Sequence, residues 1–83
     1  MQATPSVNPV PVAVPRAVTV NASLYRSHHG GEPQGHGWWL FDFYASGQCL
    51  ERRWQYNGEY ARARDAARAH ARRIGAAAAE LLP

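Results

Sequence analysis

Hydrophobic and polar residues alternate along two parts of this chain. In residues 17–27, valine, alanine and leucine occupy every second position. In residues 38–56, an apolar and aromatic run is followed by Ser46-Gly47 and a second alternating stretch. A period of two with β-branched and aromatic residues predicts strands, and a Ser-Gly pair between two such runs predicts a tight hairpin turn. We therefore expect three antiparallel strands, at 17–27, 38–44 and 49–56.

The register of the predicted hairpin decides which side chains form the core. A two-residue loop pairs Phe43 with Leu50, Phe41 with Arg52 and Trp39 with Trp54. The core face then carries Trp39, Phe41, Phe43, Leu50 and Trp54, with Arg52 reaching to its edge. The opposite, solvent-facing side of the sheet is expected to carry Trp38, Leu40, Asp42 and Tyr44 beside Glu51, Arg53 and Gln55.

An alanine-rich helix is predicted after the hairpin. Asn57 is a favourable N-cap, and a helix-forming run continues from it to Leu82. One stripe recurs at spacings of three or four, namely Tyr60, Ala63, Ala67, Ala71, Ile74, Ala78 and Leu81. Because alanine is small, this stripe lets the helix approach bulky rings on the sheet. Gly75 follows two arginines, a common end signal, so the residues after it either continue the helix or form a separate turn.

Together these elements predict an α+β fold, with a three-stranded antiparallel sheet packed against one C-terminal helix (β-β-β-α). Residues 17–83 form this single domain. Residues 1–16 contain four prolines and are expected to be a disordered tail, acting as a tether or as a docking peptide. Residues 28–37 hold four glycines and a proline, which predict a long flexible hairpin loop.

Composition narrows the class of protein. One cysteine in an 83-residue chain excludes a disulfide framework and indicates a reducing, cytoplasmic compartment. No run approaches the roughly 20 apolar residues that a membrane-spanning helix requires, so no membrane association is expected. Nine arginines and no lysine suggest a GC-rich bacterial or phage genome. The net charge of +3 is compatible with nucleic acid and with ordinary solubility.

The predicted helix carries the clearest basic feature. Arg64, Arg68 and Arg72 are spaced four apart and form a cationic row, with Arg62 and Arg73 further round the helix. Such a row neutralises phosphates when a nucleic acid is bound. The alternative is a solvated face partly paired with Asp65.

The solvent-facing side of the sheet offers a second candidate surface. Its Trp38, Tyr44, Leu40 and Arg53 are of the kind that stack bases or lie along a groove. Asp42 and Glu51 fall in the middle of this face and repel phosphates. An apolar patch rimmed by both charges also fits a protein partner or a homodimer through Trp38, Leu40 and Tyr44.

Catalytic and metal chemistry find little support in the sequence. His28, His29 and His36 share one glycine-rich loop, but a structural zinc site usually adds cysteines, and Cys49 lies in a strand. We expect Cys49 to pack as a small apolar group and His70 to be a hydrogen-bonded residue at the core boundary. No metal, cofactor, catalytic residue or small-molecule substrate is predicted, and an enzyme is the least favoured class.

Residues 38–71 resemble AP2-type and integrase N-terminal DNA-binding domains. The resemblance lies in the order of three strands and one helix, with Arg53-Trp54 on the third strand and the alanine-rich residues 60–70 on the helix. That resemblance implies that the sheet enters the major groove with Arg53 and Trp38 outward. In size and architecture the chain is also similar to small phage and mobile-element proteins, including anti-CRISPR inhibitors, which implies a stoichiometric inhibitor.

The sequence thus favours a small non-enzymatic binding module. Nucleic acid is its expected partner, contacted through Arg53, Arg64, Arg68, Arg72, Arg73 and Trp38. The alternative is a protein-interaction module of phage or mobile-element origin.

Overall fold

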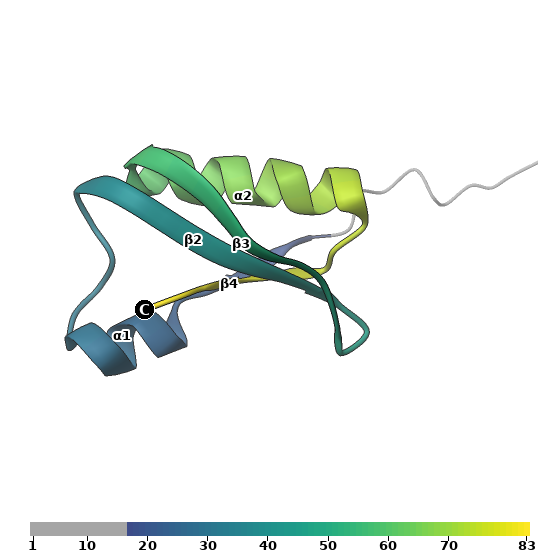
Figure 1. The fold of residues 1–83 in the computed structure, drawn as a ribbon, viewed down its shortest axis with the longest axis horizontal. Coiled ribbons are helices and arrows are strands. Elements are labelled where there is room, and N and C mark those ends of the chain that lie inside the picture. Colours follow the sequence, from purple (N-terminus) through teal and green to yellow (C-terminus); the bar gives the residue numbers. More distant parts are fainter. Residues whose placement is uncertain (1–16) are drawn as a thin grey trace, which may run out of the picture.

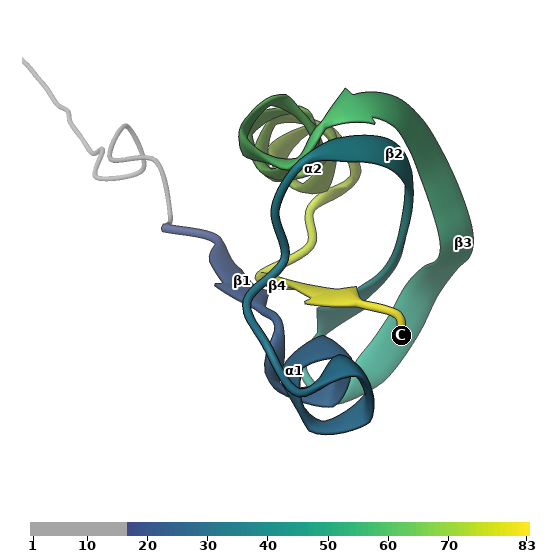
Figure 2. The ribbon, with the colours of Figure 1, turned by 90° about the vertical axis from the view of Figure 1, so that its left-hand side faces the viewer.

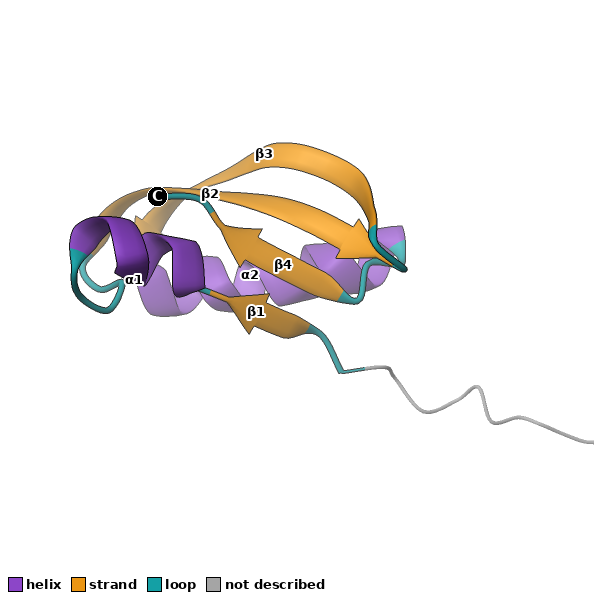
Figure 3. Ribbon diagram, turned by 90° about the horizontal axis from the view of Figure 1, so that it is seen from below, coloured by secondary structure: helices purple, strands orange, loops and turns teal. Residues whose placement is uncertain are grey.

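The computed structural model describes residues 17–83, so the predicted tail at 1–16 lies outside the described residues. The elements are β1 (Thr19–Asn21), α1 (Ser23–His29), β2 (His36–Ala45), β3 (Gln48–Glu59), α2 (Tyr60–Ile74) and β4 (Ala78–Leu81). The four strands form one sheet in the order β1-β4-β2-β3. β1 pairs with β4 in parallel, while β2 is antiparallel to β3 and to β4 (Figures 1 and 3). The α+β class is confirmed, but the three-stranded, purely antiparallel sheet is wrong.

The first predicted strand is correct only at its start. β1 ends at Asn21, whose side-chain Oδ1 accepts a hydrogen bond from the backbone N–H of Ser23 at 2.9 Å. This local bond turns the chain into α1, because asparagine side chains that bind the backbone two residues on mimic a turn. α1 then ends at Gly30, which adopts the left-handed conformation. The alternation in residues 23–27 is therefore part of a short helix, and the predicted loop at 28–37 begins inside it.

The predicted helix starts at the wrong residue, whereas the end signal at Gly75 is confirmed and the alternative of a helix continuing to Leu82 is wrong. β3 continues to Glu59, so Asn57 is a strand residue and not the N-cap. At the other end Gly75 is left-handed and donates its N–H to the Ala71 and Arg72 carbonyls, which closes α2. Residues 78–81 then form β4, inserted between β1 and β2. Two predicted stripe residues, Ala78 and Leu81, thus belong to a strand.

The hairpin turn at Ser46-Gly47 is confirmed. Both residues have positive φ, as a type I′ turn requires. The register of the two-residue loop holds for the pairs next to the turn, Ala45 with Gln48 and Tyr44 with Cys49. Two irregularities in β3 then shift the pairing, so that the rings pair as Phe43 with Glu51, Phe41 with Trp54 and Trp39 with Tyr56.

These two bulges correct the predicted core. Leu50 is 42% exposed instead of buried, and Arg52 does not face Phe41, because Trp54 takes that place. Phe41, Phe43 and Leu81 are the largest fully buried side chains, and Trp39 is buried beside them. The contact of slim helix and bulky rings is confirmed: Ala63, Ala67 and Ala71 of α2 have no exposed surface and belong to the same core cluster.

The two helices cover different parts of the sheet. In Figure 2, β1 and β4 lie between α2 and α1. α2 packs against the rings of β2 and β3, whereas α1 contributes Tyr25, whose ring centroid is 5.8 Å from that of Trp39. None of the helices in residues 17–83 is long and apolar enough to cross a membrane. The fold thus leaves the side of the sheet that carries Trp38 available for a site.

Candidate functional site

Arg53 occupies a strained position in β3. Its φ is +56°, in the left-handed region that is unfavourable for a residue with a Cβ atom. The residue sits at one of the two bulges, opposite Asp42 of β2. Its backbone N–H donates to Asp42 Oδ1 at 2.8 Å, and Asp42 is only 7% exposed. The buried carboxylate therefore holds the bulge, and the bulge sets the direction of the Arg53 side chain.

Trp38 stands at the edge of a groove that Arg53 also lines. Trp38 is 63% exposed, more than any other large apolar side chain among the described residues. The groove has a volume of about 440 Å³, and its lining includes His29, His36, Trp38, Leu40, Arg53 and Leu82. We call it the Trp38 groove. The structure thus brings together Trp38, Leu40 and Arg53, three of the predicted site residues, and adds two histidines from α1 and β2.

Neither of the carboxylates that were expected to repel phosphate lines this groove. Glu51 pairs directly with Phe43, so it faces α2 and not the Trp38 side of the sheet, which corrects its predicted placement. Its Oε1 lies 2.6 Å from His70 Nε2. Asp42 is buried in its bond to Arg53 and not exposed. Among the described residues, no acidic side chain lines the groove.

His70 is confirmed as a hydrogen-bonded residue at the core boundary. Besides its contact with Glu51, its ring stacks on Trp54 with centroids 5.0 Å apart and meets the edge of Phe43 at 5.1 Å. These contacts tie α2 to the hairpin. They explain why Trp54 is half-buried and packed against the core, since His70 and α2 cover its ring.

The predicted apolar patch is smaller than expected. Leu40 and Tyr44 are both half-buried, and Tyr44 does not line the Trp38 groove. Burial, together with the nearby Asp42 carboxylate, raises the pKa of the Tyr44 phenol. The other large apolar side chains exposed in residues 17–83, Leu24 and Leu50, also do not line the groove. Trp38 is therefore the one large exposed apolar side chain in this groove.

The α2 arginines do not line the Trp38 groove. Arg64 and Arg68 are half-buried, and both lie near Asp65, with nitrogen to oxygen distances of 3.6 and 3.7 Å. Arg72 and Arg73 are exposed in the last turn of α2. Within residues 17–83 neither of these two forms an ion pair. The predicted row is thus divided into a partly paired half and an exposed half.

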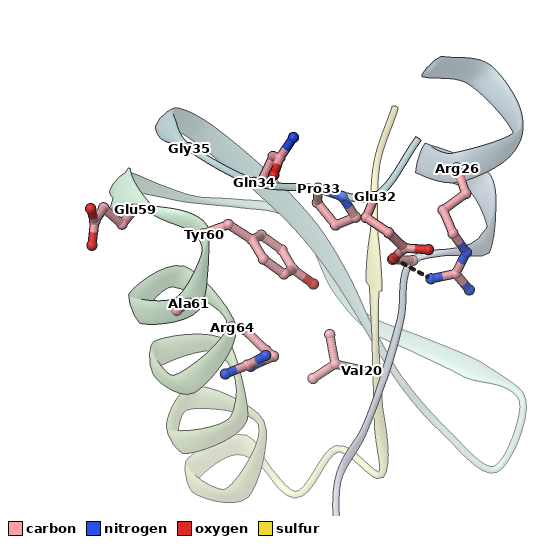
Figure 4. A pocket seen from close by; sticks show the side chains of 11 residues that line it. Val20, Arg26, Glu32, Pro33, Gln34, Gly35, Glu59, Tyr60, Ala61 and Arg64 are labelled. Atoms are coloured by element: carbon pink, nitrogen blue, oxygen red, sulfur yellow. Dashed lines mark hydrogen bonds and ion pairs between the residues drawn. The ribbon is translucent and has the colours of Figure 1, made fainter. Parts of the chain in front are cut away.

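A second pocket lies between α1 and the start of α2 (Figure 4). It has a volume of about 550 Å³, and its walls come from β1, α1, residues 32–35 and the first turns of α2. Arg26 and Glu32 form an ion pair there at 3.2 Å, and the Tyr60 hydroxyl and Arg64 face the same space. We call it the α1–α2 pocket. The sequence did not indicate it, because residues 23–27 were expected to be a strand.

The histidine-rich segment is split between elements. His28 and His29 end α1, where His29 stacks on Tyr25 at a centroid distance of 4.1 Å, and His36 begins β2. Within residues 17–83 no three metal-ligating side chains come together. Cys49 is half-buried, and its Sγ lies 3.5 Å from the Glu51 carbonyl oxygen. None of these side chains forms a second cluster with the chemistry of a site.

Comparison of the chain with protein-family models, curated proteins and solved structures gave no match. Its function is therefore inferred from its own side chains and their arrangement.

Proposed function

We propose that this domain is a non-enzymatic module that binds single-stranded nucleic acid in the Trp38 groove. One observation carries the proposal: an indole that is 63% exposed lies in the same groove as an arginine held in a strained backbone conformation. Residues in unfavourable backbone regions cluster at functional sites, where the surrounding structure maintains them. Here Asp42 maintains the conformation of Arg53.

The chemistry of the groove suits an unpaired nucleotide. An exposed tryptophan offers a flat face on which any base stacks, which requires a base that is not already stacked in a duplex. The Arg53 guanidinium supplies a charged, planar donor group for a phosphate or a base edge. His29 and His36 add further donors at the walls. A single strand therefore fits these groups better than a duplex does.

Charge supports the same partner. The chain carries a formal charge of +3, and among the described residues no acidic side chain lines the groove to oppose a phosphate. The exposed Arg72 and Arg73 of α2 offer additional phosphate contacts away from the groove. We therefore expect affinity in the micromolar range or weaker that falls as salt concentration rises, because phosphate contacts release counterions.

The alternative is a protein-interaction module, either a homodimer or a stoichiometric inhibitor of the phage type. It needs a contiguous apolar surface at Trp38, Leu40 and Tyr44. Leu40 and Tyr44 are half-buried, which leaves Trp38 as the main exposed apolar area. We therefore place this function second. Sedimentation that shows a monomer at high protein concentration would remove the homodimer.

The test is a titration of a labelled single-stranded oligonucleotide, followed by fluorescence anisotropy at low salt. Trp38→Ala should weaken binding by roughly 5- to 150-fold, since stacking on an aromatic side chain contributes roughly 1 to 3 kcal/mol per base. Leu50→Ala is the matched control, because it removes an exposed apolar side chain outside the groove. Absence of binding at low salt, or equal losses in the two variants, would remove the proposal.

A further inference from the structure

We propose that the α1–α2 pocket is a binding site for a phosphate group, held by the guanidinium groups of Arg26 and Arg64 and by the Tyr60 hydroxyl. These three side chains line one cavity but come from two helices that are far apart in the sequence. All three offer hydrogen-bond donors, and two of them carry a permanent positive charge. Such a set is suited to a compact anion with several acceptor oxygens.

Arg64 is incompletely satisfied in the described part of the chain. Its Nε is buried, yet no hydrogen-bond partner for it exists within residues 17–83. The nearest carboxylate oxygen, Asp65 Oδ1, is 3.6 Å away, too far for a hydrogen bond. A buried donor without an acceptor is costly, and a bound anion would supply that acceptor or draw the guanidinium toward one. The Arg64 side chain as a whole is 40% exposed, so part of it is open to solvent although Nε is not.

Tyr60 places a donor at the centre of the pocket. Its ring extends from the start of α2, with the hydroxyl pointing into the space near Arg64 and Val20 (Figure 4). Burial raises the pKa of this phenol, while the positive charges of Arg64, Arg68 and Arg26 act in the opposite direction. Three guanidinium groups therefore act electrostatically at the position of the hydroxyl, and Glu32 is the only carboxylate among the causes of the shift.

Glu32 acts as an internal competitor for the site. Its carboxylate accepts a hydrogen bond from Arg26 at 3.2 Å, but its side chain is 72% exposed. Exposed ion pairs of this kind contribute little to stability, so an incoming phosphate can displace the carboxylate. The other acidic residue of the lining, Glu59, directs its carboxylate away from Tyr60 and Arg64 in Figure 4.

The phosphate has two sources that this chemistry does not separate: a free phosphate or nucleotide, and the backbone of a nucleic acid. Gln34 lines both this pocket and the Trp38 groove, so the two sites adjoin across residues 33–37. A single-stranded nucleic acid with one base stacked on Trp38 can therefore place a neighbouring phosphate near Arg26 and Arg64. The pocket itself does not depend on the proposed function, because none of its three donors lines the groove.

Inorganic phosphate is the first probe, added to the isotope-labelled full chain while backbone amide shifts are followed by NMR. Saturable shifts should gather at residues 20–22, 32–35 and 60–64. Arg64→Gln should weaken phosphate binding by roughly tenfold, the usual scale for losing a charge-assisted hydrogen bond. Arg62→Gln is the matched control on the same helix, since Arg62 is exposed and outside the lining.

Glu32→Gln gives the sharper test, because a loss of binding can come from poor folding but a gain cannot. Removing the competing carboxylate should strengthen phosphate binding several-fold, whereas Glu80→Gln, which makes the same change of charge on β4, should change it much less. Absence of saturable shifts, or equal effects of Arg62→Gln and Arg64→Gln, would overturn the site.

The source is decided with a short single-stranded oligonucleotide as second probe. If the oligonucleotide displaces inorganic phosphate from the pocket, the pocket binds the phosphates of a nucleic-acid backbone. If inorganic phosphate stays bound, the pocket binds a free phosphate group or a nucleotide. Both results support the site. Trp38→Ala separates the two proposals, since it should weaken binding of the oligonucleotide and leave binding of inorganic phosphate unchanged.

Discussion

The buried carboxylate of Asp42 and the backbone N–H of Arg53 are joined by a 2.8 Å hydrogen bond that links β2 to the bulge in β3. The bond satisfies the one buried charged side chain of the described core. It also stabilises a left-handed arginine, which costs roughly 1 to 2 kcal/mol relative to ordinary backbone. Stability and the geometry of the Trp38 groove are therefore coupled through this pair.

Removing the Asp42 carboxylate should destabilise the domain. Asp42→Ala leaves the Arg53 N–H without its acceptor and is expected to lower the free energy of unfolding by about 1 to 3 kcal/mol. Asp42→Asn is the control, because its side-chain oxygen can still accept the bond, and it should cost clearly less. Urea denaturation followed by circular dichroism measures both; equal stabilities of Asp42→Ala and the unmodified chain would contradict the role of the bond.

Glycine at position 53 should separate stability from binding. Arg53→Gly relieves the left-handed strain and is expected to stabilise the domain by up to about 1 kcal/mol, while loss of the guanidinium weakens oligonucleotide binding. Arg53→Ala loses the guanidinium but keeps the strain, so it should weaken binding without the gain in stability. Thermal denaturation and anisotropy on the same samples check this, and a destabilised Arg53→Gly would argue against strain at the bulge.

Enlarging the alanine face of α2 should be costly. Ala67 has no exposed surface and lies in the cluster with the rings of β2, so Ala67→Leu is expected to destabilise the domain by about 1 to 3 kcal/mol through overpacking. Ala69→Leu adds the same side chain at an exposed position of the same helix and should change stability by less than about 0.5 kcal/mol. Similar denaturation midpoints for the two variants would show that α2 does not approach the sheet closely.

Alkaline pH should weaken the fold through Tyr60. Burial raises the pKa of its phenol above the ordinary value of 10.0, so the folded chain ionises later than the unfolded chain. The stability this residue contributes is fully present below pH 10.0 and is lost as the pH rises through the raised value. Tyr60→Phe should show less alkaline loss of stability than the unmodified chain, measured by denaturation across this range; an identical loss would place its cause elsewhere, with Tyr44 the next candidate.

The parts of the fold that the sequence predicted correctly depend on local patterns. Ser46-Gly47 forms the two-residue turn of the β2–β3 hairpin, in which both residues adopt positive φ. The rings of Phe41 and Phe43 are buried, and Ala63, Ala67 and Ala71 lie among them, because periodicity identifies the apolar face of each element. Trp38 was correctly placed in solvent for the same reason.

The parts that it missed depend on contacts between distant residues. Residues 78–81 are rich in alanine, a strong helix former, and become a strand only because β1 and β2 lie on either side of them. The bulges of β3 contain arginine and leucine instead of the glycine that usually marks such a position, so the register beyond Cys49 was not predictable from turn length. The α1–α2 pocket was missed with α1, whose short length leaves a weak periodic signal.

The position of β4 also constrains how the domain assembles. Its four residues follow every other element in the chain, yet they separate β1 from β2 and supply the fully buried Leu81. The β2–β3 hairpin and α2 can form early from neighbouring segments, whereas β1 acquires a sheet partner only when residues about sixty positions further along the chain arrive. We therefore expect a folding transition limited by closure of this distant parallel pair, with a hairpin and helix that are only marginally stable before it.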